Sequence, residues 1–294
     1  MRSFYFTWHT GNDQSVQGSL RNKIRCMTLL MAAAVLLVSD IRVKGGERSA
    51  YDRACYGVLI GAQPQAVLAA QPYSIVVIDA EYYMAEEIEF LHERGQEVWA
   101  YINIGALENF RTYYEEFADD VLGPYEGWDE EYWMDVSETS WQQHIEELAM
   151  TCAGLGIDGL FLDNADVYNE YPTDEIYQGL KSILELTEPL TDTITLNGGD
   201  TFVERYLAEG GSAVDAVNQE GVFGTFDEDG NLIRQDAAVS VYYRTYLERC
   251  RENGLETYLV EYTEDEAVVA EIEAYCVETG SRCYISASKE LTEN

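Results

Sequence analysis

Basic side chains are scarce in this 294-residue sequence, which has 18 Lys and Arg against 54 Asp and Glu and a formal net charge of −36 at pH 7. A protein that binds nucleic acid needs basic side chains to neutralise phosphates, and a protein that docks on anionic lipid needs them too. The composition therefore argues against both functions. It favours a cationic partner, or a need for solubility.

Histidine is also rare, and the metal-binding motifs are missing. The three histidines are His9, His92 and His144, and no pair of them has the spacing of metal ligands. No C-x-x-C or H-E-x-x-H motif occurs. Neither His92 nor His144 follows a predicted strand, where a Ser-His-Asp hydrolase would need its base. We therefore expect no metal and no cofactor, which leaves carboxylates and 22 tyrosines for chemistry.

The N-terminal segment has the order of a secretory signal. A basic stretch at residues 21–25 precedes an apolar run from Met27 to Val38. This run is shorter than the roughly 20 residues of a transmembrane helix. We predict an N-terminal extension with a signal peptide at residues 1–40 and a secreted or cell-surface protein. An uncleaved signal anchor stays open as the alternative, and no other membrane domain is expected.

From residue 55 onward, short apolar runs alternate with helical patterns. Near-continuous apolar runs are typical of parallel strands covered by helices. Eight of them with helical crossovers predict a single (β/α)8 TIM barrel over residues 50–290, of the α/β class. A doubly wound sheet is the alternative, but no Gly-x-Gly-x-x-Gly follows a strand. The strands are expected at residues 57–61, 74–79, 98–104, 157–163, 193–197, 214–219, 256–261 and 282–286. The helices are expected at about 84–94, 140–155, 173–187, 200–209, 236–253 and 264–279.

Two departures from a regular barrel are expected. Residues 105–139 form a long insertion after the third strand, which we place over the carboxyl-terminal mouth of the barrel. The sequence stops soon after the eighth strand, so the last helix is expected to be truncated or missing. No internal repeat is visible, and we expect one barrel domain and a monomer. The aromatic residues of the insertion include Tyr113, Tyr114, Tyr125, Trp128, Tyr132 and Trp133.

Five cysteines follow the predicted signal segment, an odd number that leaves at least one thiol free. Export would allow the thiols to oxidise. Cys55 and Cys283 flank the first and last predicted strands, so we expect them to be neighbours. The sequence does not fix how the cysteines pair.

Acidic and amide side chains follow almost every predicted strand, where the active sites of barrels lie. Asp163 directly ends the apolar run 159–162, and an acid in line with a buried strand is costly unless it is used or paired. Glu220 follows the sixth strand, and Asp79 follows the second. We take Asp163 and Glu220 as the catalytic candidates and assign Asp79 to substrate binding. Two facing carboxylates in an aromatic-lined cleft are typical of glycoside hydrolysis.

Five sequence motifs resemble those of glycoside hydrolase family 114, in the same order, over residues 55 to 287. The most specific runs from Gly156 to Tyr168 and reads GIDGLFLDNADVY. The others are Tyr101–Ala106 with Glu108 and Arg111, Trp133–Ser137 followed by Trp141, Asn218–Phe223, and Val260–Tyr262. The resemblance implies a barrel of the endo-α-1,4-polygalactosaminidase type.

The resemblance also implies residue roles and a substrate. Asp163 would be the nucleophile and Glu220 the acid/base. The substrate would be an α-1,4-linked galactosamine polymer, which is a polycation when its amines are free and would be attracted by a protein of this charge. The expected substrate-binding residues are Asp79, Tyr101, Asn103, Asp135, Asn164, Asp166, Tyr168, Asn197, Asn218, Glu261 and Tyr262. The acids expected to contact the sugar amines are Asp79, Asp135, Asp166 and Glu261.

Two other functions stay open at this point. The first is a non-catalytic carbohydrate-binding barrel, which would keep Asp79 and the aromatic residues; intact Asp163 and Glu220 count against it. The second is a glycosidase that acts on a different exopolysaccharide. The separation of the two carboxylates distinguishes catalysis from binding, because retaining and inverting enzymes each hold it within a narrow range.

Overall fold

The structure is a computed structural model that describes residues 51–125, 128 and 130–292. The predicted extension and signal segment at residues 1–40 lie outside the described residues. No helix in the described part is long and apolar enough to span a membrane.

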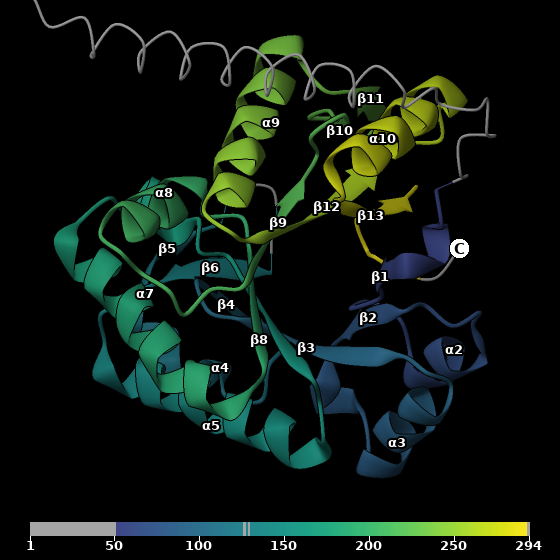
Figure 1. The fold of residues 1–294 in the computed structure, drawn as a ribbon. Helices are drawn as coiled ribbons and strands as arrows, with labels where there is room; N and C mark the ends of the chain where they lie inside the picture. Colours follow the sequence, from purple (N-terminus) through teal and green to yellow (C-terminus); the bar gives the residue numbers. More distant parts are fainter. Residues whose placement is uncertain (1–50, 126–127, 129, 293–294) are drawn as a thin grey trace, which may run out of the picture. The chain divides into compact units, whose positions relative to one another are not determined.

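All eight predicted strands form, and they make one parallel sheet (Figure 1). Their order in the sheet is their order in the chain, as in a barrel, whereas a doubly wound sheet reverses direction. The two outer strands of the sheet contact each other, so the barrel is nearly closed. The strands are β1 (Tyr56–Val58), β2 (Ile75–Ile78), β3 (Glu97–Asn103), β7 (Gly159–Asp163), β8 (Thr193–Asn197), β9 (Ala216–Glu220), β12 (Glu256–Tyr262) and β13 (Arg282–Ser286).

Helices connect the strands and cover the outside of the sheet (Figure 1). Six of them lie within one or two residues of the predicted segments. These are α3 (Ala85–Glu93), α5 (Thr139–Leu155), α7 (Asp174–Thr187), α8 (Asp200–Ala208), α9 (Ala237–Glu252) and α10 (Glu266–Thr279). Three short helices were not predicted: α2 (Pro64–Ala69), α4 (Tyr114–Phe117) and α6 (Val167–Glu170).

Side chains alternate between the barrel interior and the helix layer, as strand geometry requires. On β7, Leu160 and Leu162 are fully buried in the cluster that includes the helices. Burying each such side chain stabilises the fold by about 1.5–3 kcal/mol. Inside the barrel, the rings of Trp99 and Tyr56 both pack on Tyr258, with centroids 5.1 and 4.8 Å away. These aromatic rings fill the interior, so only the mouth of the barrel is free for a site.

The segment after β3 forms a small antiparallel sheet with strand order β4-β6-β5. Trp141 at the start of α5 is fully buried and donates a hydrogen bond to the Ile104 carbonyl at 2.9 Å, which anchors one end of the segment. The sheet brings Glu131 next to Asn103 at the carboxyl end of β3. Its strands are β4 (Ala106–Glu108), β5 (Val121–Pro124) and β6 (Glu131–Met134); a separate hairpin pairs β10 (Gly224–Phe226) with β11 (Leu232–Arg234).

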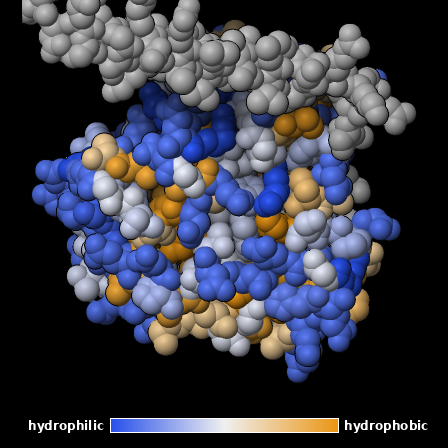
Figure 2. All heavy atoms as spheres, in the orientation of Figure 1, coloured by the Kyte–Doolittle hydropathy of each residue, from blue (hydrophilic) through white to orange (hydrophobic). Residues whose placement is uncertain are grey.

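Cys55 and Cys283 both contact Tyr51. The Tyr51 hydroxyl lies 3.1 Å from the Cys55 sulfur and accepts a hydrogen bond from the Cys283 amide at 2.5 Å. The two cysteines therefore lie close together, as expected, and all five described cysteines are free thiols. The face shown in Figure 2 is mainly hydrophilic, with small separate hydrophobic areas.

Candidate active site

The inward-facing residues at the carboxyl ends of neighbouring strands meet at the mouth of the barrel. Asn103 on β3 pairs with Asp163 on β7, and Asn197 on β8 pairs with Asn218 on β9. Glu220 ends β9, next to β12. The register of the parallel sheet therefore brings the polar ends of these strands together, because carboxyl ends of parallel strands lie at one rim.

The side-chain amide of Asn197 connects the two catalytic candidates. Its nitrogen donates to the Asp163 Oδ1 at 2.7 Å and to the Glu220 Oε1 at 2.8 Å. Both hydrogen bonds start at the same nitrogen. The distance between Asp163 Oδ1 and Glu220 Oε1 therefore cannot exceed the sum of the two hydrogen-bond lengths. These two oxygens are therefore at most about 5.5 Å apart, which agrees with the carboxyl separation of about 5–5.5 Å in retaining glycosidases better than with the roughly 6.5–9.5 Å of inverting ones.

Further neutral donors hold each carboxylate. The Asn164 backbone amide donates to Asp163 Oδ1 at 2.8 Å, and the Tyr262 hydroxyl donates to Glu220 Oε2 at 2.5 Å. Behind them, Asn218 donates to the side-chain carbonyl oxygen of Asn197 at 2.6 Å, which fixes the orientation of the bridging amide. The amide nitrogen of Asn197 must then face the two carboxylates.

Burial dominates the electrostatics of this pair. Burial raises the pKa of Asp163 well above its usual range, and the negative charge of Glu220 raises it further. The pKa of Tyr262 is also raised, first by burial and then by Glu220, so its hydroxyl stays a donor. Asp163 therefore retains its proton at a pH where an isolated aspartate would be ionised.

Asn164 adopts the left-handed backbone conformation, with φ of 65°, directly after Asp163. This conformation is uncommon for a residue with a side chain and is often found where function requires it. The glycine at position 105 leaves room for the Asn164 backbone, because a Cβ atom at that position would lie 1.7 Å from the Asn164 carbonyl oxygen. The turn lets one residue hold Asp163 through its backbone and reach Asn103 through its side chain, at 3.1 Å.

Glu131 is a third carboxylate at this rim, and the sequence did not predict it. Its Oε2 accepts from Asn103 at 3.2 Å and from Asn164 at 3.4 Å. Burial, followed by the charge of Glu108, raises its pKa to about 7. Glu131 lies in the insertion, 28 positions after Asn103, and only the antiparallel pairing of β4 with β6 brings it here. The acid-aromatic sequence EYWM of β6 was the available signal.

Arg111 organises a separate group of acids on the β2 side of the mouth. Its guanidinium pairs with Asp79 at 2.9 Å, with Glu108 at 2.5 Å and with Glu81 at 3.3 Å. Burial raises the pKa of Asp79 to about 6, although Arg111 opposes the shift. Tyr101, predicted to bind substrate, donates to Glu108 at 3.4 Å. Asp79 and Tyr101 therefore belong to this ion-paired group, not to the carboxylate pair.

Asp166 and Tyr168 lie on the other side, after β7. Burial raises the pKa of Asp166 to about 6. Its Oδ2 lies 1.8 Å from where a Cβ atom of residue 198 would be, so only glycine fits there. The Tyr168 hydroxyl accepts from Arg205 at 3.0 Å. Tyr125, stacked on Trp133 with ring centroids 4.0 Å apart, lines the mouth near Asp166, Asp163, Glu131 and Glu220.

Two predicted binding residues have other contacts. Glu261 is fully buried and accepts hydrogen bonds from the backbone amides of residues 222–224, at 2.9–3.2 Å, so it holds the loop after β9. Burial raises its pKa to about 8. Asp135 accepts from the backbone amide and hydroxyl of Ser137, at 3.0 and 2.6 Å, and thereby fixes the turn before α5. The structure does not bring either residue into contact with the carboxylate pair.

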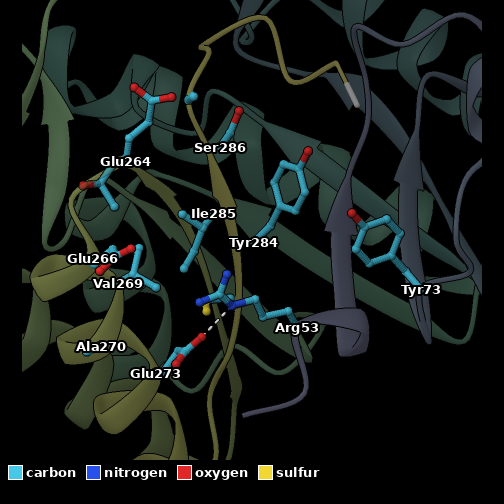
Figure 3. Close-up of a pocket in the computed structure, with 13 residues that line it drawn as sticks. Arg53, Tyr73, Glu264, Glu266, Val269, Ala270, Glu273, Tyr284, Ile285 and Ser286 are labelled. Carbon is cyan, nitrogen blue, oxygen red and sulfur yellow. Dashed lines mark hydrogen bonds and ion pairs between the residues drawn. The ribbon is translucent and has the colours of Figure 1, made fainter. Parts of the chain in front are cut away.

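A large cavity lies away from this mouth. It has a volume of about 800 Å³ and runs between α10 and β13 (Figure 3). Arg53 and Glu273 form an ion pair of 2.5 Å beside it, and Tyr73 lines it from the β2 side. Neither catalytic candidate lines this cavity.

The mouth is suited to acid/base and nucleophilic chemistry by carboxylates. Within the described residues, no group of three His, Cys, Asp or Glu side chains is arranged to hold a metal ion. Two acids that share one amide donor, beside the stacked rings of Tyr125 and Trp133, have the geometry of glycoside hydrolysis. Fold and site together define the class as a glycoside hydrolase barrel.

Comparison with known proteins identifies the family. Residues 56–292 match the model of glycoside-hydrolase family GH114, so the chain belongs to that family, as the sequence motifs predicted. It is thus an O-glycosyl hydrolase by family. No curated protein sequence matches the chain.

Solved structures show the same fold at low identity. The glycoside hydrolase domain of PelA from Pseudomonas aeruginosa is similar with a TM-score of 0.69 and 20% identity, over 81% of this chain and 96% of that one. Aspergillus fumigatus Ega3, solved in complex with galactosamine, has a TM-score of 0.63 and 15% identity, over 84% and 95%. The α-galactosidase TtGalA from Thermus thermophilus has a TM-score of 0.57 and 14% identity, over 85% and 60%.

Proposed function

We propose that this protein hydrolyses an α-1,4-linked galactosamine polymer with retention of anomeric configuration, with Asp163 and Glu220 as its catalytic residues. The bridging amide of Asn197 is the observation that carries the proposal, because one nitrogen bonded to both carboxylates holds them at the short separation of a retaining pair. The family and the galactosamine complex of Ega3 support the choice of sugar.

In the first step, an Asp163 oxygen attacks the anomeric carbon while the glycosidic C–O bond breaks and Glu220 gives its proton to the leaving oxygen. This step leaves a covalent glycosyl-enzyme ester. In the second step, a water molecule loses a proton to Glu220 and attacks the same carbon, which releases Asp163. The division of roles follows the family resemblance, and it requires the proton that burial favours on Asp163 to lie on Glu220 when the substrate is bound. Two inversions give overall retention.

The donors around the pair suit this cycle. Asn197 and the Asn164 backbone amide donate to Asp163, which stabilises the charged nucleophile before attack and after release. Tyr262 donates to Glu220 and holds the carboxyl group in place while it loses and regains a proton. Neither carboxylate forms an ion pair with a Lys or Arg in the part of the chain that the structure describes; the nearby Arg111 pairs with other acids. No paired cation therefore favours the ionised form of either carboxylate.

A free sugar amine fits the charge of the mouth. The charges of Asp166, Asp163, Glu131 and Glu220 all raise the pKa of Tyr125, after the larger effect of burial, so four carboxyl groups act on this part of the mouth. An ammonium group placed among them would be attracted and would favour their ionised forms. This arrangement supports a polymer that is at least partly de-N-acetylated.

The test is product release from partly de-N-acetylated α-1,4-galactosaminan. We expect oligosaccharides from residues 40–294 and a loss of at least about 1,000-fold in rate for Asp163→Asn and Glu220→Gln. Asp192→Asn is the matched control, because Asp192 is exposed and precedes β8 at the opposite end of the barrel. Near-wild-type rates in either catalytic variant would remove that residue from the mechanism. Release by neither wild type nor control would leave a different glycan or a binding role.

We also propose that the protein is exported, with residues 1–40 acting as a signal peptide. The basic stretch and the short apolar run are the support. Expression of the full chain in a bacterial host, followed by mass determination of the exported product, tests this. A mature N-terminus near Ser39 is expected, and a full-length protein retained in the cytoplasm would contradict it.

A further inference from the structure

A second cavity lies beside the catalytic mouth, and no residue of the catalytic pair lines it. Its volume is about 530 Å³. It is formed by the short helix α6, the start of α8 and the first turns of α9. Its lining consists of three tyrosines with a proline and amide, hydroxyl and carboxylate groups: Tyr168, Asn169, Pro172, Asp200, Thr201, Tyr242 and Tyr243.

Asp200 supplies a negative charge at the base of this cavity. It is only 6% exposed. One of its oxygens accepts from Asn169 at 3.0 Å and the other accepts from the Tyr242 hydroxyl. Among the described residues Asp200 forms no ion pair with Lys or Arg, so neutral donors alone hold this carboxylate. Each carboxylate oxygen has a second lone pair that an incoming donor can use.

Side-chain contacts link the lining of the cavity to residues of the catalytic mouth. The Asn169 side-chain amide that donates to Asp200 also donates a hydrogen bond to Asp166, at 3.4 Å. Asp166 lies three residues after Asp163 in the chain. Tyr243 lies close enough to Asp200, Asp166 and Glu220 for all three to raise its pKa, after the larger effect of burial. These contacts place the cavity near the side of the mouth that follows β7, within reach of a polymer that extends from the carboxylate pair on that side.

We propose that this cavity is a distal subsite that takes one amino-sugar unit of the substrate polymer, with its ammonium group on Asp200 and its ring against Tyr242. The inference rests on the proposed function for the polymer but not on the catalytic step. Tyr242 is 44% exposed and lines the cavity, so part of its side chain is open to a sugar ring. Tyrosine faces also attract cations, which adds to the preference for a free amine.

The subsite predicts that affinity depends on chain length. Binding is measured by calorimetry in the Asp163→Asn background, which prevents turnover, with α-1,4-galactosamine trimer and octamer. The octamer should bind about tenfold more tightly than the trimer, because only the longer chain spans both sites. Adding Tyr242→Ala should remove most of this gain and leave trimer affinity unchanged. Phe90→Ala is the matched control, because Phe90 is 43% exposed on α3, far along the chain, and should keep the gain.

The fully N-acetylated octamer tests the role of Asp200. Asp200→Asn should weaken binding of the free-amine octamer and leave the affinity of the N-acetylated octamer almost unchanged, since the N-acetylated octamer brings no ammonium group to this carboxylate. Equal binding of trimer and octamer, or a length gain that survives Tyr242→Ala, would overturn the subsite. Equal effects on both octamers would overturn the contact between amine and Asp200. A length gain in the Asp163→Asn background, together with a wild type that releases no product, would contradict the proposed hydrolysis and leave the subsite standing.

Discussion

Two groups of acids share the mouth of this barrel, and they differ in what holds them. On the β2 side, Asp79, Glu81 and Glu108 all form ion pairs with one cation, Arg111. On the β7–β9 side, Asp163 and Glu220 receive hydrogen bonds from amides and a tyrosine, with no cation paired to them in the described residues. A charge that the protein neutralises serves the fold, whereas one held by neutral donors remains available for a proton or a cationic ligand.

The largest expected effect comes from removing the cation of the first group. Arg111→Met should lower the free energy of unfolding by about 3–5 kcal/mol, because it leaves buried carboxylates without a partner. Chemical denaturation at pH 7 measures it. Arg205→Met serves as the control, since Arg205 is part of a more exposed network on α8 and should lose much less. Equal losses would mean that Arg111 has no special role in the fold.

Removing the neutral bridge of the second group should affect rate more than stability. Asn197→Ala deletes one donor to each carboxylate, and loss of a preorganised donor typically costs about 100–1,000-fold in kcat. Kinetics on the galactosamine polymer, with the unfolding free energy measured in parallel, tests this. A large loss of stability with kcat almost unchanged would assign Asn197 to the fold.

A smaller effect is expected at Tyr262. Tyr262→Phe removes a hydrogen bond to Glu220 and keeps the ring. A hydrogen bond to a charged group contributes about 1.5–3 kcal/mol, so the rate should fall by roughly tenfold to 100-fold and its pH profile should shift. Tyr258→Phe is the control inside the same strand, because its hydroxyl contacts Glu256 at the other end of β12. A pH profile identical to wild type would contradict the contact.

The smallest effect, counted per pH unit, is the pH dependence of stability due to Glu261. Its folded pKa of about 8 lies above the ordinary value of about 4.3, so the folded state holds the proton longer. The contribution of Glu261 to the free energy of unfolding is therefore fully present below about pH 4.3. It falls as the pH rises to about 8, by at most about 1.4 kcal/mol per pH unit. Denaturation at pH 5 and 8 should show a shallower fall in Glu261→Gln than in the exposed control Glu264→Gln. An equal fall in unfolding free energy between pH 5 and 8 in Glu261→Gln and Glu264→Gln would contradict the raised pKa of Glu261.

The strands and most of the helices could be predicted from the sequence, because buried parallel strands appear as apolar runs. The position of the site could be predicted too, because barrel sites lie at strand ends. Asp163, Asn197 and Glu220 were found in this way. Glu261 could have been separated from them by alternation, since its neighbour Tyr262 faces the site and adjacent strand residues face opposite sides. Glu131 could not be found, because its position depends on the register of an antiparallel sheet inside the insertion.

The ion pair between Arg111 and Asp79 could not be predicted from the sequence either. Arg111 belongs to a recognised motif, but its contact with Asp79 joins residues from two different segments, β2 and the insertion. Nothing in the local pattern distinguished an acid that is ion-paired from one that is held by amides. The difference between the two groups of acids therefore needed the three-dimensional arrangement of β2, β3 and the insertion.

The anomeric configuration of the first product tests the central claim most directly. Proton NMR during early hydrolysis of the galactosamine polymer follows the new reducing end before it equilibrates. The short separation that Asn197 imposes on the Asp163 and Glu220 oxygens predicts that the α anomer forms first and the β anomer appears later. Initial release of the β anomer would contradict a double displacement by this pair.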